Sequence, residues 1–384
     1  MGDLIADAHA HQALRYRSPS EAHIASLESR ILVASDIPAA IDAVHSLGAV
    51  CWLDQFTEIP EEIAVAAAGY FGVSRDSVRI IGSAQFGFSL LNLRTFCPGT
   101  SDLDLAIIDR NLAERMREEL GASCPEDTYC IRPDKIGTSD LARRWMAFFH
   151  GLQADHGQWF SSVTATIYPD WHSFRIQQLE AYYAFIGIRE INRQLPFSQL
   201  DQRRATSAFE ADRATLADLG RFSTRIDECH TANASPHVVD GRRLRSMFHE
   251  HGRRRHLVNM LAHALEMFPP SIKVHHLLIG GSVLNLNVRD PQDLDCLLYY
   301  SVGTTGAGKE SSAAAASMLR AARWILKAAK IDARFVPVDA GALMIARMTS
   351  FMTSLYCASR SGCPTNVGTL LVDLSAMEKG FVES

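Results

Sequence analysis

The sequence lacks the marks of several protein classes. Its eight cysteines include no Cys-x-x-Cys pair and show no regular spacing, and its histidines show no zinc-binding spacing accompanied by cysteine. The opening MGDLIADAHAHQ has neither the basic end nor the apolar run of a signal peptide. No apolar stretch is long enough to span a bilayer. We therefore expect a cytoplasmic protein with reduced thiols and no membrane association.

An excess of positive charge is also missing. The chain has 38 Lys and Arg residues against 43 Asp and Glu residues, a formal net charge of -5. This balance argues against a protein that coats nucleic acid non-specifically, although it leaves room for a local basic face. Hydrophobic residues make up 47% and charged residues 21%, which is ordinary for a globular protein, so we do not expect disorder to dominate.

The pattern along the chain predicts mixed α and β structure in two domains. At 384 residues the chain is long for a single hydrophobic core. Residues 228–241 have little periodicity and several turn formers, so we expect them to link a first domain at 1–227 to a second at 242–384. Helical patterns extend over 20–72, 110–121, 140–195, 241–268 and 310–330, with a short helical tail at the end. Strands are predicted within 77–109, before Gly280, within 293–300 and at 331–339.

The two halves repeat one arrangement. IIGSAQFG followed by SDLDLAII in the first half matches LIGGSVLN followed by QDLDCLLY in the second. Each copy has an apolar strand, Gly-Ser, a variable loop, and Asp-Leu-Asp opening another apolar strand. Either element alone is a weak signal, but the ordered and duplicated pair is specific.

This pattern resembles the nucleotidyltransferase superfamily that includes DNA polymerase β, whose motif is a hydrophobic residue, Gly-Ser, a loop and Asp-x-Asp. The resemblance covers roughly 77–109 and 277–338. It implies an α/β (α+β) fold of two tandem nucleotidyltransferase-like domains, each a small mixed sheet flanked by helices, with added helical segments. In that family a third carboxylate comes from a later strand, and KIDARFVPVD at 330–339 makes Asp332 the matching residue.

The chemistry of these residues agrees with the resemblance. Asp293 and Asp295 are two apart on a strand and therefore share a face, where their charges need a cation. Mg²⁺ prefers hard oxygen ligands, and two metal ions can bind the attacking and leaving oxygens of an in-line displacement. We expect Asp293, Asp295 and Asp332 to be catalytic metal ligands. Gly281 would let the backbone approach a triphosphate, and Ser282 would offer its hydroxyl and N–H.

The first half is less complete. Gly82, Ser83, Asp102 and Asp104 fit the same phosphate-binding, catalytic and metal-binding roles. The loop between Ser83 and Asp102 is longer than its counterpart, and Asp170 is the nearest candidate for a third acid. The first half is thus either catalytic with two carboxylates or a nucleotide-binding or scaffold domain.

A phosphate-loop motif competes inside the second half. GTTGAGKE at 303–310 matches GxxxxGK, but Glu310 stands where Ser or Thr should hold Mg²⁺. The preceding strand already carries Asp293 and Asp295, so we favour a flexible connection over a phosphate contact from Lys309.

The predicted helix at 241–268 is rich in arginine. Residues three and four apart share a helix face, so several of these side chains could meet a phosphate backbone, although a solvated face is the commoner outcome. The arginines are Arg242, Arg243, Arg245, Arg253, Arg254 and Arg255.

Together these features predict an enzyme that depends on Mg²⁺ or Mn²⁺ and moves a nucleoside monophosphate from an NTP to an acceptor hydroxyl, releasing pyrophosphate. The resemblance leaves the acceptor open among an RNA or tRNA end, a protein and a small molecule, and some members of the family serve bacterial toxin or antiviral defence systems. Two alternatives stay open: a nucleotide-binding regulatory pseudoenzyme and a P-loop NTPase. A protein partner or a homo-oligomer is compatible with each of them.

Overall fold

The computed structural model divides the chain into two compact units. The first comprises residues 1–185 with 308–317, and the second 186–307 with 318–384. The division falls inside helix α8 (Trp171–Gln194) rather than at the linker expected at 228–241. The residues that the structure describes are 21–33, 36–45, 58–120, 130–132, 140–194, 199–219, 235–249, 252–303, 309–357 and 368–374.

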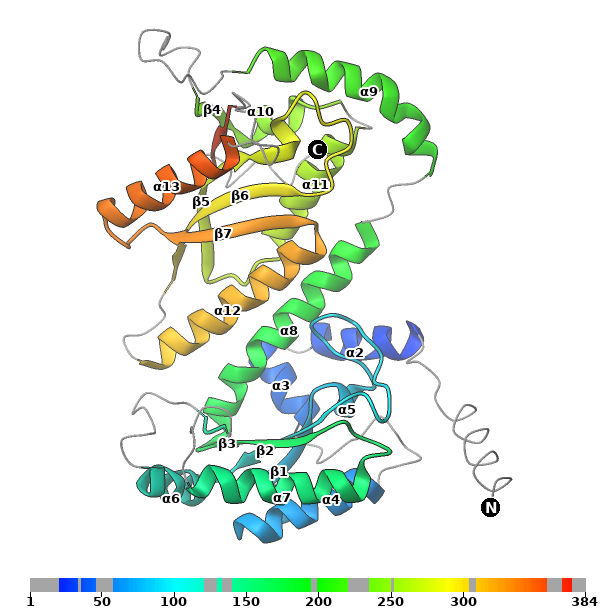
Figure 1. Cartoon of the computed structure of the whole chain (residues 1–384), viewed down its shortest axis with the longest axis vertical. Helices are drawn as coiled ribbons and strands as arrows, with labels where there is room; N and C mark the ends of the chain where they lie inside the picture. Colours follow the sequence, from blue (N-terminus) through cyan, green and yellow to red (C-terminus); the bar gives the residue numbers. More distant parts are fainter. Residues whose placement is uncertain are drawn as a thin grey trace. The chain divides into compact units, whose positions relative to one another are not determined.

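The first unit contains a three-stranded mixed sheet in the order β1-β2-β3 (Figure 1). Strand β1 pairs antiparallel with β2, and β2 pairs parallel with β3. The strands are β1 (Val78–Ile81), β2 (Leu103–Ile108) and β3 (Val163–Tyr168). The helices are α2 (Glu21–Val33), α3 (Ile37–His45), α4 (Glu58–Phe71), α5 (Ser83–Phe86), α6 (Arg110–Leu120), α7 (Asp140–His156) and the first part of α8, with a 3-10 turn at Arg75–Ser77.

Helices α4, α6 and α7 cover one face of this sheet (Figure 1). Helix α6 shows why: Leu112, Met116 and Leu120 recur every fourth residue and are buried on one side. Alternate residues of β2, Leu103 and Leu105 among them, point into the same core.

Aromatic residues surround a buried histidine in the first unit. The ring nitrogens of His45 lie 3.2 Å from Nε2 of Gln85 and 3.1 Å from the hydroxyl of Tyr182. Burial, with a smaller contribution from the charge of Arg79, lowers the pKa of His45 to about 3. His45 is therefore a neutral core residue, in line with a structural role.

The second unit contains a five-stranded mixed sheet in the order β4-β8-β5-β6-β7. Strands β5 and β6 are antiparallel, and β6 and β7 are parallel. The strands are β4 (His237–Asp240), β5 (Ile272–Gly280), β6 (Leu294–Val302), β7 (Ile331–Pro337) and β8 (Leu370–Asp373). The helices are α9 (Gln199–Ala217), α10 (Gly241–Ser246), α11 (Arg253–Glu266), α12 (Lys309–Ala328) and α13 (Ala342–Cys357), with a 3-10 turn at Gly281–Leu284.

The two faces of this sheet pack against different helices. Leu294, Cys296 and Leu298 belong to the core shared with α11 and α12. Leu297 and Tyr299 point the other way, into a smaller core with α13. Because side chains alternate along a strand, Asp295 must face α13.

Both units share one strand arrangement. In each, a strand ends at a Gly-Ser turn, an antiparallel strand carries the Asp-Leu-Asp motif, and a helical crossover leads to a parallel third strand. Gly82 and Gly281, the glycines of the two Gly-Ser turns, both have φ of 71°. The repeat expected from the sequence is thus present in the backbone as a shared topology.

Several short strands depart from the sequence prediction. Strand β3 lies inside the helix expected at 140–195, because VTATIY at 163–168 is rich in β-branched residues between two genuine helices. Strand β4 lies within the expected linker 228–241, and β8 follows α13 in the region expected to be a helical tail. Each of these two strands has only four residues.

The arginine-rich segment is also not one helix. It forms α10 and α11, separated by residues around Gly252, so the continuous helix expected at 241–268 is wrong.

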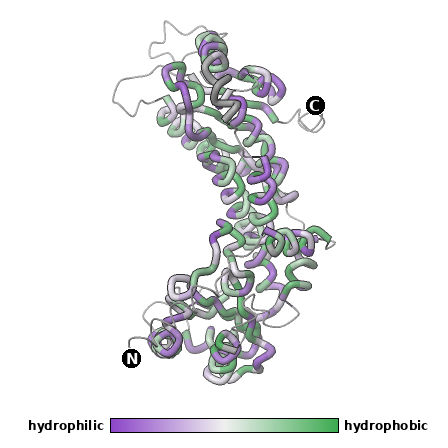
Figure 2. Tube along the Cα trace, turned by 90° about the vertical axis from the view of Figure 1, so that its right-hand side faces the viewer, coloured by the Kyte–Doolittle hydropathy of each residue, from purple (hydrophilic) through white to green (hydrophobic). Residues whose placement is uncertain are grey.

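None of the described helices is long and apolar enough to cross a membrane. Hydrophilic and hydrophobic residues are interspersed along the long helices in Figure 2, as expected for helices with one face on a core.

Candidate active site

Two carboxylates of the second unit occupy paired positions on neighbouring strands. Asp295 of β6 is the register partner of Asp332 of β7 in a parallel ladder. Paired residues of parallel strands lie about 4.8 Å apart and point to the same face. Both side chains therefore lie on the α13 face of the sheet, near the beginning of their strands.

The Gly-Ser turn lies directly beside Asp295. Gly280, the last residue of β5, is the register partner of Asp295, and Gly281 follows with φ of 71°. A Cβ placed on Gly281 would be 2.0 Å from Oδ2 of Asp295, so only glycine fits there. The hydroxyl of Ser282 is buried and has no hydrogen-bond partner within the described part of the chain. At this turn a ligand could approach the backbone of Gly281 closely and accept a hydrogen bond from the Ser282 hydroxyl.

Helix α13 adds a tyrosine that the sequence analysis missed. A Cβ on Gly280 would lie 2.4 Å from Cβ of Tyr356, so this tyrosine packs on the glycine backbone. Burial raises the pKa of Tyr356 above its ordinary range, Cys296, Asp295 and Asp332 raise it further, and Arg334 opposes them. Tyr356 is therefore a neutral hydroxyl near both carboxylates. The sequence signal for this contact is the Gly280–Gly281 pair, because each glycine lets another side chain approach the backbone closely: Tyr356 at Gly280 and Asp295 at Gly281.

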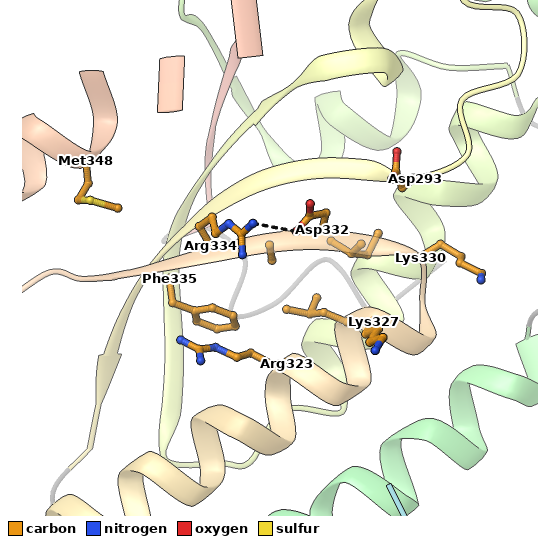
Figure 3. Close-up of a pocket in the computed structure, with 11 residues that line it drawn as sticks. Asp293, Arg323, Lys327, Lys330, Asp332, Arg334, Phe335 and Met348 are labelled. Atoms are coloured by element: carbon orange, nitrogen blue, oxygen red, sulfur yellow. Dashed lines mark ion pairs between the residues drawn. The ribbon is translucent and has the colours of Figure 1, made fainter. Parts of the chain in front are cut away.

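Asp293 and Asp332 line a pocket of about 660 Å³ beside β7 (Figure 3). Arg334 points toward Asp332 in this view, with 4.0 Å between its guanidinium and Oδ1 of Asp332. Asp332 is exposed, so this ion pair is weak and a stronger cation can displace it.

A buried arginine holds the loop that joins Ser282 to Asp293. Arg254 of α11 is 1% exposed and donates hydrogen bonds to the carbonyls of Val283 and Asn285, at 2.8 and 3.1 Å, and of Val288. Its guanidinium also lies 3.9 Å from Asp212 of α9, which is equally buried. Arg254 thus serves the loop and is unable to form part of an exposed basic face.

In the first unit Gly82, Ser83 and Asp104 lie together as Gly281, Ser282 and Asp295 do in the second, but the residue on the third strand differs. A Cβ on Gly82 would lie 3.2 Å from Oδ2 of Asp104, and Ser83 begins α5 just beyond. Burial raises the pKa of Asp104 to about 6, with a further contribution from exposed Asp102 and opposing ones from Thr164 and Arg132.

Thr164 stands where the second unit has Asp332. Asp104 pairs with Thr164 in the β2–β3 ladder as Asp295 pairs with Asp332 in the β6–β7 ladder. The suggestion that Asp170 supplies the third acid is wrong. Asp170 lies beyond the far end of β3, where its carboxylate accepts a hydrogen bond from the N–H of Ser173 at 2.7 Å.

The donors of the second unit fit a hard divalent cation only in part. Asp295 and Asp332 offer oxygen ligands from one face, as Mg²⁺ requires. Within the described ranges, however, no three His, Cys, Asp or Glu side chains are grouped closely enough to hold a metal ion. Arg334 is the described cation next to Asp332, at 4.0 Å from Oδ1.

Two further sequence predictions concern the phosphate-loop motif at 303–310 and the arginine-rich face at 242–255. Residues 304–308 of GTTGAGKE and the side chains of Lys309 and Glu310 lie outside the described residues, and α12 begins at Lys309. The basic face proposed for 242–255 is not continuous, since its arginines are divided between α10 and α11 and Arg254 is buried.

Comparison with known proteins gives no relative: no family model, curated protein or solved structure matches this chain significantly. Any functional assignment therefore depends on the residues and geometry described above.

Proposed function

We propose that the protein is a nucleotidyltransferase whose working site lies in the second unit. The observation that carries the proposal is the pairing of Asp295 with Asp332 on one sheet face, directly against the Gly281–Ser282 turn. Two parallel strands and a glycine turn place carboxylates, a close backbone approach and an unused buried hydroxyl in one place. This combination suits a ligand that carries both phosphate and a divalent cation.

Each residue of the site would have a separate role in binding the metal ion or the triphosphate. Asp295 and Asp332 would hold Mg²⁺ or Mn²⁺, which supplies charge neutralisation at the phosphates. Gly281 would admit the triphosphate close to the backbone, and the Ser282 hydroxyl would donate to a phosphate oxygen. Tyr356 keeps its proton at neutral pH and closes the α13 side of the site. An acceptor hydroxyl would give up its proton to solvent water and attack the α-phosphorus, and the bond to the bridging oxygen would break as pyrophosphate leaves.

The first unit is better suited to nucleotide binding or support than to transfer. It retains Gly82, Ser83, Asp102 and Asp104, but Thr164 replaces the carboxylate on the third strand. A hydroxyl is a weaker metal ligand than a carboxylate, so a two-metal clamp is incomplete there.

A second candidate is a regulatory protein that binds nucleotide without turning it over. The contact of Arg334 with Asp332 favours it, because a guanidinium is already placed against one metal ligand. The two candidates differ in whether pyrophosphate is released.

The test incubates the purified full chain with each α-labelled NTP, Mg²⁺ and separate RNA, protein and small-molecule fractions of a cell extract. Label in one fraction, with matching pyrophosphate release, is expected. Asp295→Asn and Asp332→Asn should each reduce transfer by about 10²–10³-fold. Asp339→Asn is the matched control, since Asp339 is an exposed carboxylate just beyond β7. Undiminished transfer by Asp332→Asn would refute the site, and NTP binding without any transfer would favour the regulatory protein.

A further inference from the structure

The pocket beside β7 extends from the carboxylates toward a row of basic side chains. Its walls come from β7 and from the end of α12 (Figure 3). Strand β7 is the last strand in the sheet order, so the pocket lies at a sheet edge. Its volume, about 660 Å³, is within the range of ligand-binding sites.

Three cations share one side of this pocket. Arg323 and Lys327 are four residues apart and lie on one face of α12, and Lys330 follows in the turn between the end of α12 and the start of β7. All three are exposed, and none of them forms an ion pair with another described residue. Arg323 also lies over the ring of Phe335, 5.4 Å from its centre, which helps to fix its position.

This row matches a chain of phosphates better than a single anion. One phosphate or carboxylate would engage one or two of these cations, whereas a phosphodiester backbone offers successive charges along its length. The opposing charges of the pocket, Asp293 and Asp332, lie at the side nearest the proposed metal site. A ligand bound along the row would thus have one end beside Asp332.

The triphosphate site proposed at Gly281 and Ser282 and this pocket lie on opposite sides of β6 in the sheet order. In the sheet order, β5 with Gly281 is on one side of β6, and β7 with the pocket is on the other. Neither Gly281 nor Ser282 lines the pocket. A transfer reaction needs the NTP and the acceptor on either side of the carboxylates, because the acceptor hydroxyl must reach the α-phosphorus of the NTP there.

We propose that the α12–β7 pocket binds the phosphodiester backbone of a nucleic-acid acceptor and directs its hydroxyl end to Asp332. This inference rests on the proposed transferase function and specifies its acceptor. It moves the nucleic-acid contact from the arginines at 242–255 to Arg323, Lys327 and Lys330, at the end of α12 and in the turn that follows it.

The test measures binding directly and does not depend on turnover. A fluorescein-labelled single-stranded RNA of about 12 nucleotides is titrated with the full chain, and anisotropy is read at several salt concentrations, with DNA of the same sequence in parallel. The test variant is Lys327→Gln/Lys330→Gln. The matched control is Arg242→Gln/Arg243→Gln, which removes the same charge from two exposed arginines of α10 outside the pocket.

We expect the test variant to bind the oligonucleotide roughly tenfold more weakly and to lose about 1.4 from the log-log salt slope, with the control close to the parent protein. NTP affinity should stay unchanged in both variants. Equal weakening in test and control, or absence of oligonucleotide binding, would overturn the proposal. A loss of NTP affinity with intact oligonucleotide binding would also overturn it, since it would assign the pocket to the triphosphate. If the oligonucleotide binds as expected and no transfer occurs, the transferase function fails while the nucleic-acid contact stands.

Discussion

Thr164 donates a hydrogen bond from its hydroxyl to Oδ1 of Asp104, at 3.2 Å, across the β2–β3 ladder. This contact gives the carboxylate of Asp104 a neutral partner. The equivalent position in the second unit, Asp332 beside Asp295, carries a second carboxylate. One side chain therefore distinguishes the two units: the carboxylate of Asp104 has a neutral hydroxyl as its neighbour on the next strand, whereas that of Asp295 has a second carboxylate.

Replacing Thr164 should change how the first unit responds to metal. Thr164→Asp puts two carboxylates side by side, which should destabilise the metal-free protein through like-charge repulsion. Mn²⁺ should then raise the melting temperature of the variant by more than it raises that of the parent protein. Differential scanning calorimetry with Mn²⁺ and with EDTA measures both effects. An identical Mn²⁺ response in variant and parent would contradict the equivalence of Thr164 and Asp332.

Asp104 should make the protein less stable as pH rises. Its folded pKa, raised to about 6, lies above the usual value of 3.8, so the folded state binds more protons than the unfolded state between these two values. Stability from this group is present below pH 3.8 and is lost as pH rises through 6. Asp104→Asn should therefore be more stable than the parent by roughly 3 kcal/mol at pH 7.5, and about equal to it near pH 4.

Urea denaturation of the full chain in EDTA at the two pH values checks this expectation. Asp155→Asn, which removes an exposed carboxylate of α7, is the control and should change little at either pH. A variant that is equally stabilised at both values would show that the effect is not protonation.

Gly281 should be intolerant of alanine beyond the usual penalty for positive φ. Gly281→Ala adds that backbone penalty, about 1 kcal/mol, to a clash with Asp295. Gly341→Ala isolates the first effect, because Gly341 has φ of 86° and nothing lies within 4 Å of a Cβ placed there. Unfolding free energy and NTP affinity are measured for both. We expect a larger loss of stability, and loss of NTP affinity, only for Gly281→Ala; equal losses would argue against close approach at Asp295.

Arg254 should matter for stability far more than its neighbour. Arg254→Met removes the donors of three loop carbonyls and leaves Asp212 buried without its cation, which should reduce the unfolding free energy by about 3–5 kcal/mol. Arg253→Met, at a less buried position on the same helix, should lose less than about 1 kcal/mol. Urea denaturation compares the two. Adding Asp212→Asn to Arg254→Met should recover part of the loss, and failure to do so would contradict the buried pair.

The local parts of the site could be predicted from the sequence, whereas the pairings between distant segments could not. Gly281, Ser282 and Asp295 lie in one strand-turn-strand unit, and their motif indicated that they would meet. The partners of these strands come from remote segments: nothing near VTATIY shows that Thr164 will pair with Asp104. Tyr356 reaches the site from α13 through packing on Gly280, a contact without a sequence periodicity of its own.

The errors in secondary structure have a similar origin. Strands β4 and β8 have four residues each, too few for alternation to be recognised. They are strands because β8 pairs with β5 and β4 pairs with β8. The sequence pattern predicts one shared helix for the arginines of 242–255, with a face either solvated or on a phosphate backbone, but the fold divides them between α10 and α11 and buries Arg254.

The place of β8 has a consequence for biosynthesis. This strand, the last one described along the chain, lies between β4 and β5, and therefore joins strands that leave the ribosome well before it. Until residue 373 has emerged, β5 keeps an open edge on the side opposite β6, and such an edge is prone to pair with other chains. The sheet of the second unit therefore cannot be completed until β8 has left the ribosome, long after β4 and β5 have done so.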